Sequence, residues 1–240
     1  MTQFQIRQCM NSACRFRFPV TPEDRIGNDC PICGSPVQMM LEQQSPPETK
    51  IATKIATKIA TRPETKIAAP QTKPLALHVL LDNVRSTFNV GSIFRTADGA
   101  GVQELYLCGI TPTPDHPKVG KTALGAEQVI AWSHHNNGLD LACSLKAKGA
   151  TLFALEENPT AISLFNLPLA RDNMARDNAP LVLIVGNEIT GVDPGLLALC
   201  DQVLAIPMWG IKQSLNVATA FGIAIYELRR QLASPPNRVS

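Results

Sequence analysis

Four cysteines near the N-terminus have the spacing of a tetrahedral metal site. Cys9 and Cys14 are separated by four residues and Cys30 and Cys33 by two, with fifteen residues between the pairs. Two such knuckles can place four thiolates around one Zn²⁺ ion, in a closed site whose role is structural. So short a segment would not fold on an apolar core alone, and metal binding would supply folding free energy. The sequence therefore predicts a zinc-ribbon-like module over residues 1–41. Two disulfides, unliganded thiols or a rubredoxin-like iron site are the alternatives.

Polar side chains also gather after apolar runs in the rest of the chain, at residues 82–83, 156–157, 186–188 and 207–216. The third of these clusters places the carboxylate of Glu188 beside glycine, which lets backbone approach a ligand closely. A tight turn with a capping acid explains the same residues without a ligand. Walker-type phosphate loops, metalloprotease motifs and a Gly-x-Ser-x-Gly elbow are absent from the sequence.

The elements that must position these clusters alternate between strand and helix. Strands are predicted at 75–81, 104–107, 129–132, 151–155, 181–185 and 203–206, and helices at 89–101, 139–148, 194–200 and 215–232. This alternation predicts an α/β domain with a largely parallel sheet, in which ligands lie beyond the carboxyl ends of the strands. Ser214 is the expected N-cap of the last helix. Apolar residues on nearly every face of that helix predict burial on several sides.

Residues 42–74 differ in composition from both flanking parts. Ile-Ala-Thr-Lys repeats almost without change, prolines recur, and six Lys or Arg face three Glu. A four-residue period buries no face of a helix or strand, so the segment is predicted to be a flexible basic linker before a main domain at 75–240. Such a tether would either add affinity for phosphates or serve as a solvated spacer.

The composition of the whole chain limits the class of protein to which it can belong. Of 240 residues, 45% are apolar and 18% charged, which is typical of a globular protein. No apolar run reaches the ~18 residues of a membrane span, and the first ten residues lack the apolar core of a secretory signal. Seven cysteines without a signal favour metal or free thiols over disulfides. A cytoplasmic enzyme or binding protein with no membrane association is expected.

Three stretches, taken in order, resemble the SpoU/TrmH family of SPOUT RNA 2′-O-ribose methyltransferases. They are NVGSIFRTA at 89–97, LIVGNEITG at 183–191, and the segment 206–228 from IPM through SLN to YEL. The likeness covers essentially all of 75–232. It implies a C-terminal trefoil knot, S-adenosylmethionine as cofactor, an obligate homodimer, and RNA (tRNA or rRNA) as substrate.

The resemblance also assigns site residues. Arg95 matches the family's catalytic arginine and is expected to clamp a phosphate beside the reacting hydroxyl, with the proton acceptor left open. Asn89 and Glu188 are expected to orient loops and the dimer contact. Ser214 and Asn216 are expected to shape the substrate side of the pocket.

The cofactor would be held by backbone at Gly186, Ile206 and Leu215, again by resemblance. Since S-adenosylmethionine carries no phosphate, the missing glycine-rich phosphate loop does not count against it. Two alternatives remain open from the sequence. One is an RNA-binding module with an idle methyltransferase pocket, and the other is a base-methylating SPOUT enzyme.

Overall fold

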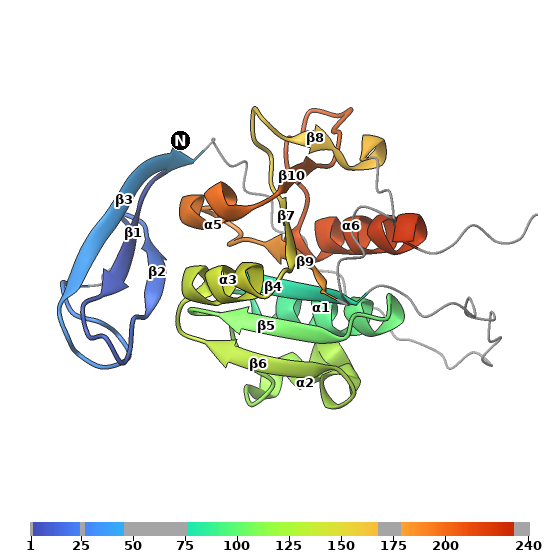
Figure 1. Cartoon of the computed structure of the whole chain (residues 1–240). Coiled ribbons are helices and arrows are strands. Elements are labelled where there is room, and N and C mark those ends of the chain that lie inside the picture. Colours follow the sequence, from blue (N-terminus) through green and yellow to red (C-terminus); the bar gives the residue numbers. More distant parts are fainter. Residues whose placement is uncertain (1, 25–26, 46–75, 168–178, 233–240) are drawn as a thin grey trace, which may run out of the picture.

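The computed structural model describes residues 2–24, 27–45, 76–167 and 179–232, which form an N-terminal ribbon and a larger α/β domain (Figure 1). Of the predicted linker 42–74, residues 42–45 belong to the last strand of the ribbon, and residues 46–74 lie outside the described residues. Among the described helices, none is long and apolar enough to cross a membrane.

The N-terminal ribbon is a three-stranded antiparallel sheet in the order β2-β1-β3. Its strands are β1 (Thr2–Cys9), β2 (Arg17–Val20) and β3 (Val37–Ser45). The small core consists of Phe16, Phe18 and Val20 with two of the cysteines. So few apolar side chains agree with a module that needs a further source of folding free energy.

The α/β domain contains a seven-stranded sheet in the order β6-β5-β4-β9-β7-β10-β8, and every neighbouring pair is parallel. Its strands are β4 (Leu77–Asp82), β5 (Glu104–Cys108), β6 (Ala131–His135), β7 (Thr151–Leu155), β8 (Ile162–Ser163), β9 (Leu181–Val185) and β10 (Gln202–Ala205). The predicted parallel α/β sheet is confirmed. The short edge strand β8 was not predicted.

Helices cover both faces of the sheet (Figure 1). Helices α1 (Thr87–Gly99), α2 (Pro117–Ala123) and α6 (Val217–Leu232) share one apolar core with the sheet, and α3 (Gly138–Ala147) and α5 (Pro194–Leu199) share the other. Short 3₁₀ turns occur at Ala126–Gln128 and Leu164–Asn166. Alternate residues of each central strand enter opposite cores, as in Leu183 and Ile184 of β9. Both faces being buried explains why these strands are continuous apolar runs.

Helix α6 corrects two expectations. Within one chain it buries a single stripe, Phe221, Ala224, Ile225, Leu228 and Leu232, while Ile223 and Tyr226 are exposed. The prediction of burial on several sides was therefore wrong for the single chain, because apolar residues off the 3.6-residue stripe find no partner there.

The predicted N-cap of α6 was also wrong. The side-chain oxygen of Asn216 accepts hydrogen bonds from the amides of Ala218 (3.0 Å) and Thr219 (3.3 Å), whereas Ser214 lies two residues upstream and is exposed. Asn216 thus satisfies two of the free donors of the first turn.

Candidate active site and metal centre

The carboxylate of Glu188 lies at the centre of the candidate active site. It accepts hydrogen bonds from the backbone amides of Arg85 (2.8 Å) and Ser86 (3.0 Å) and from the side-chain amide of Asn89 (2.9 Å). These donors belong to the N-terminal end of α1, where free amides and the helix dipole favour an anion. Glu188, in the loop after β9, therefore fixes the start of the helix that carries Arg95.

Asn89 connects this contact to the third motif. Its side-chain oxygen accepts a hydrogen bond of 3.1 Å from the side-chain amide of Asn216, the residue that caps α6. The structure thus brings Glu188, Asn89 and Asn216 together, although 127 positions separate the two asparagines. Ser214 takes no part in these hydrogen bonds among the described residues.

The loop that presents Glu188 is tightly closed on itself. Asn187 and Gly191 exchange backbone hydrogen bonds of 3.0 Å, and the side chain of Asn187 accepts from the amides of Ile189 and Thr190. A Cβ at Gly186 would lie 2.3 Å from backbone atoms of Gly191 and Val192, and Gly191 has φ +73°. Both glycines are therefore required by the turn itself.

Replacing Glu188 with glutamine is expected to destabilise the protein by about 1–3 kcal/mol, because an amide offers one acceptor oxygen and turns an N–H group toward the donors that the carboxylate now accepts. Urea unfolding of the Glu188→Gln variant measures this loss. Glu157→Gln, at an exposed glutamate after β7, is the matched control. Equal stability of the two variants would contradict the anchoring role.

Arg95 lies on the exposed side of α1. Within the described part of the chain its guanidinium forms no hydrogen bond or ion pair, so a structural salt bridge does not account for it. An exposed, uncommitted guanidinium can bind a phosphate with a planar fork of N–H donors.

The three residues expected at the cofactor lie at the carboxyl end of the sheet. In the strand register Leu155 of β7 is level with Val185 of β9 and Leu204 of β10. Gly186 and Ile206 therefore leave the two strands that flank β7, about 10 Å apart at the usual strand spacing. Leu215, before α6, is 38% exposed. Apolar side chains and free backbone groups suit an adenosine that carries no phosphate.

The four cysteines of the ribbon form one cluster, with all sulfurs within 4.8 Å of one another. The Sγ atoms of Cys9 and Cys33 are 3.5 Å apart, and those of Cys14 and Cys30 are 3.9 Å apart. Sulfurs bound tetrahedrally to Zn²⁺ at about 2.3 Å stand about 3.8 Å apart. A disulfide requires about 2.05 Å. The cluster therefore fits a tetrahedral metal ion.

The surroundings of two of these thiols shift their pKa values in opposite directions. Hydrogen bonds from Ser35 lower the pKa of Cys33 to about 6, while burial raises the pKa of Cys9 to about 12. A metal ion must therefore displace a tightly held proton from Cys9. Because protons compete with the metal for thiolates, metal affinity is expected to fall as the pH is lowered.

The sequence placed Asp82 and Glu156 in polar clusters after predicted strands, but it did not show the contacts by which they support the Glu188 loop. Glu156 accepts a hydrogen bond from the Val192 amide (2.9 Å), and the Asp193 amide donates to Asp82 (2.9 Å). Asp82 and Glu156 each follow a predicted strand. That position indicates a site residue, but it does not show which group the residue contacts.

Fold and site together define a SPOUT-type α/β methyltransferase, with its motifs joined at the carboxyl end of a parallel sheet. Residues 76–226 match the model of the SpoU rRNA Methylase family. This match covers more than half of the chain, and the chain therefore belongs to that family. The N-terminal ribbon lies outside the match.

Characterised relatives agree with this placement. The tRNA (guanosine(18)-2′-O)-methyltransferases of Aquifex aeolicus and Thermus thermophilus are 32% and 34% identical, over 65% of this chain and 69% and 75% of their own lengths. The structure of an AdoMet-bound rRNA methyltransferase from Sinorhizobium meliloti superposes with a TM-score of 0.59 at 30% identity, over 68% of this chain and 59% of that one. In each case the likeness covers about two thirds of this chain.

Proposed function

We propose that this protein transfers a methyl group from S-adenosylmethionine to a ribose 2′-hydroxyl of tRNA or rRNA. The observation that carries the proposal is the chain of contacts from Glu188 through Asn89 to Asn216, because it assembles the three family motifs around the helix of Arg95. Membership of the SpoU rRNA Methylase family and the names of the relatives support the same reaction.

In this reaction the ribose 2′-oxygen loses its proton as it attacks the methyl carbon in line with the departing sulfur. S-adenosylmethionine supplies a methyl group activated by a sulfonium centre. Arginine keeps its charge in proteins and is a poor base. Arg95 is therefore assigned the role of a clamp on the adjacent phosphate, which holds the hydroxyl in the attacking geometry.

The other site residues hold this geometry. Glu188 and Asn89 orient the start of α1, and Asn216 fixes the start of α6 beside it, with Ser214 on the substrate side. Backbone at Gly186, Ile206 and Leu215 would hold the adenosine part of the cofactor.

Two further parts of the proposal concern assembly. The segment before α6 exposes large apolar side chains, with Trp209 88% and Ile211 fully exposed, and a second copy of the chain in a homodimer would cover them. In the ribbon, Cys9, Cys14, Cys30 and Cys33 would hold one structural Zn²⁺.

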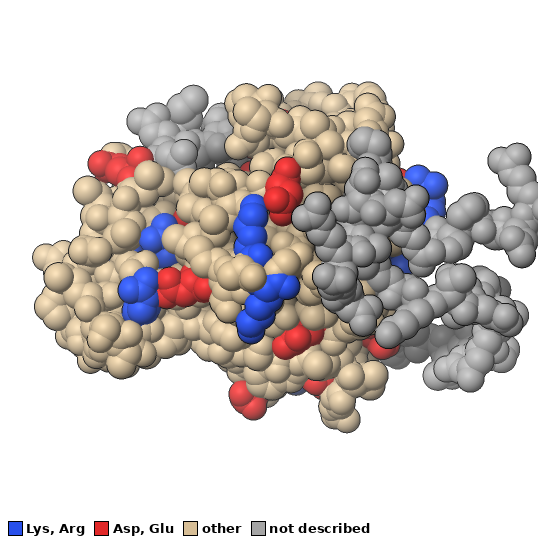
Figure 2. Space-filling model, viewed as in Figure 1, with Lys and Arg blue, Asp and Glu red and all other residues tan. Residues whose placement is uncertain are grey.

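The face shown in Figure 2 has no continuous basic surface among its described side chains. On the face shown in Figure 2, the described basic side chains are interspersed with acidic ones. Specific contacts near Arg95 would therefore contribute more than bulk charge on this face.

The proposed reaction is tested by incubating the protein with methyl-labelled S-adenosylmethionine and bulk RNA, followed by digestion to nucleosides. Label in 2′-O-methyl nucleosides is the expected result. Label on a base would identify a base methyltransferase, and RNA binding without label would identify an idle pocket. Either outcome overturns the proposal.

A further inference from the structure

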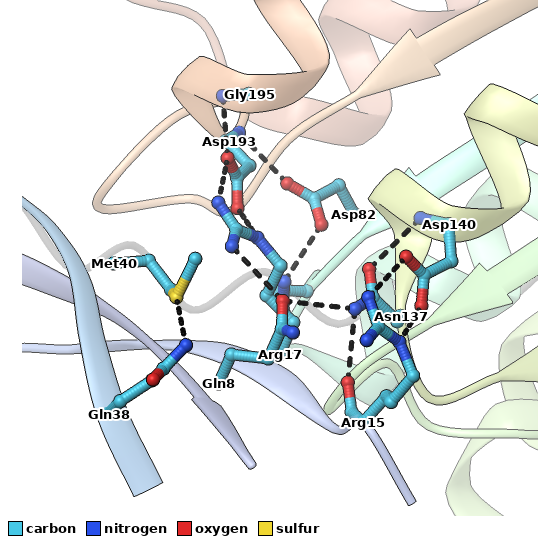
Figure 3. A network of polar contacts seen from close by, with 11 residues as sticks. Gln8, Arg15, Arg17, Gln38, Met40, Asp82, Asn137, Asp140, Asp193 and Gly195 are labelled. Atoms are coloured by element: carbon cyan, nitrogen blue, oxygen red, sulfur yellow. Dashed lines mark hydrogen bonds and ion pairs between the residues drawn. The ribbon is translucent and has the colours of Figure 1, made fainter. Parts of the chain in front are cut away.

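The N-terminal ribbon is docked on the carboxyl end of the sheet by polar contacts (Figure 3). The backbone amide of Arg17 donates to the carbonyl of Asn136 (3.1 Å), and the Asn136 side chain donates to the carbonyl of Cys14 (3.1 Å). The next residue, Asn137, donates to the side chain of Gln8 (3.2 Å). Backbone of the ribbon, including that of a cysteine of the cluster, is thus joined to the loop between β6 and α3.

A buried ion pair lies at the centre of this interface. The guanidinium of Arg17 binds both carboxylate oxygens of Asp193, at 2.6 and 3.0 Å, and its remaining nitrogen donates to Gln8 (3.3 Å). The two charged side chains are only 7% and 3% exposed. Since both charges are removed from water, loss of one leaves the other without compensation.

Asp193 closes the loop that presents Glu188. Its carboxylate accepts from the Gly195 amide (2.7 Å) at the start of α5, and its own amide donates to Asp82 at the end of β4 (2.9 Å). The loop is thus held by β9 at one end and by Asp193 at the other. Glu188, between these anchors, determines where α1 begins.

We infer that Arg17 is a positioning residue for methyl transfer, since its ion pair with Asp193 makes the geometry of the Glu188 loop depend on the docked ribbon. Arg17 itself is too buried to touch RNA, and it acts through Asp193. The inference rests on the proposed function, because its main readout is ribose methylation.

The charges around Asp82 give the inference a pH signature. Burial and the charge of Asp193 raise the pKa of Asp82 to about 7, while Arg17 acts in the opposite direction. Buried Cys108 also faces Asp82, and its own pKa is raised. Without Arg17 one contribution that lowers the pKa of Asp82 is lost, so Asp82 keeps its proton to a higher pH, and neutral Asp82 does not repel the unpaired charge of Asp193. The defect of an Arg17 variant is therefore expected to be smallest below pH 7 and to grow as the pH rises.

The test compares Arg17→Gln with Arg15→Gln in the full chain. Arg15 is a matched control because it also pairs across the interface, with Asp140 of α3, but the two side chains are 48% and 44% exposed and do not contact the loop. Displacement of a catalytic element by about 1 Å can cost about 10²-fold in rate. Arg17→Gln is expected to lower kcat by about that factor, with KM for RNA and cofactor affinity within about threefold of wild type. Arg15→Gln is expected to stay within about twofold of wild type.

A double variant tests whether the effect passes through Asp193. Asn is as good an N-cap as Asp, so Asp193→Asn preserves the start of α5. In Arg17→Gln/Asp193→Asn no buried charge of the pair is left uncompensated, and its kcat is expected to exceed that of either single variant. Zinc content and the thermal midpoint show whether each variant is folded. If Arg17→Gln does not fold, Arg17→Lys is compared with Arg15→Gln instead. This variant keeps the positive charge but lacks the planar fork of the guanidinium.

Several outcomes overturn the inference. Equal kcat for Arg17→Gln and Arg15→Gln, a change confined to KM for RNA, or a double variant no better than the single ones would each do so. Absence of ribose methylation by the wild-type protein would instead overturn the proposed function, so the two failures are distinguishable.

Discussion

Replacing Arg95 with alanine is expected to lower the rate of ribose methylation by about 10²–10³-fold, the usual cost of losing one electrostatic contact of the transition state. Arg95 is exposed and forms no hydrogen bond or ion pair among the described residues, so its truncation should leave the fold intact. Affinity for S-adenosylmethionine is expected to stay within a few-fold, because the residues expected at the cofactor lie at the ends of β9 and β10 and before α6. Arg95→Lys is expected to rescue little, since an ammonium lacks the planar fork.

The measurement is a single-turnover rate on a true substrate RNA, alongside equilibrium binding of the cofactor. Lys148→Ala removes an exposed cation at the end of α3, on the other side of the sheet, and is the control. Asn216→Ala is expected to weaken both cofactor binding and methylation, because Asn216 caps α6 beside Leu215. A near wild-type rate for Arg95→Ala would show that Arg95 is structural and that the proposed site is wrong.

Replacing both Cys30 and Cys33 with serine is expected to remove the metal from the ribbon. A structural Zn²⁺ supplies about 10–16 kcal/mol of apparent folding free energy in small zinc modules. The ribbon has few apolar core residues to compensate for its loss. Cofactor binding is expected to survive, whereas methylation is expected to fall, because an unfolded ribbon cannot present Arg17 to Asp193.

Elemental analysis is expected to show one zinc per wild-type chain and none in the Cys30→Ser/Cys33→Ser variant. Cys143→Ser is the control, since Cys143 is exposed on α3 and is not part of the four-cysteine cluster. Stoichiometric zinc in the double variant would refute the site, and stoichiometric iron in the wild-type chain would identify a rubredoxin-like centre instead.

The sequence alone determined the central strands of the sheet and the identity of the motifs. At the edges of the sheet it missed β8 and placed β6, which is Ala131–His135, at 129–132. The predicted strands at 151–155 and 181–185 coincide with β7 and β9. Buried parallel strands are continuous apolar runs, which one-dimensional patterns record well. The four cysteines were also recognisable, because metal ligands must recur at short spacings. Helix α2 was not predicted from the sequence, although Pro117 at its first position is a helix-start signal.

The tertiary structure alone decided which polar groups meet. The partners of Glu188 lie about a hundred positions away, and Arg17 and Asp193 are separated by 176. Such pairs depend on the order of the strands in the sheet and on which charged side chains become buried. Neither property produces a periodic pattern in the sequence. Asn216 and Ser214 are both good caps by residue type, and only the start of α1, where Asn89 accepts a hydrogen bond from Asn216, decides between them. The sequence therefore supplied the chemical groups, and the folded chain decided their contacts, because local patterns record burial but not the geometry between distant segments.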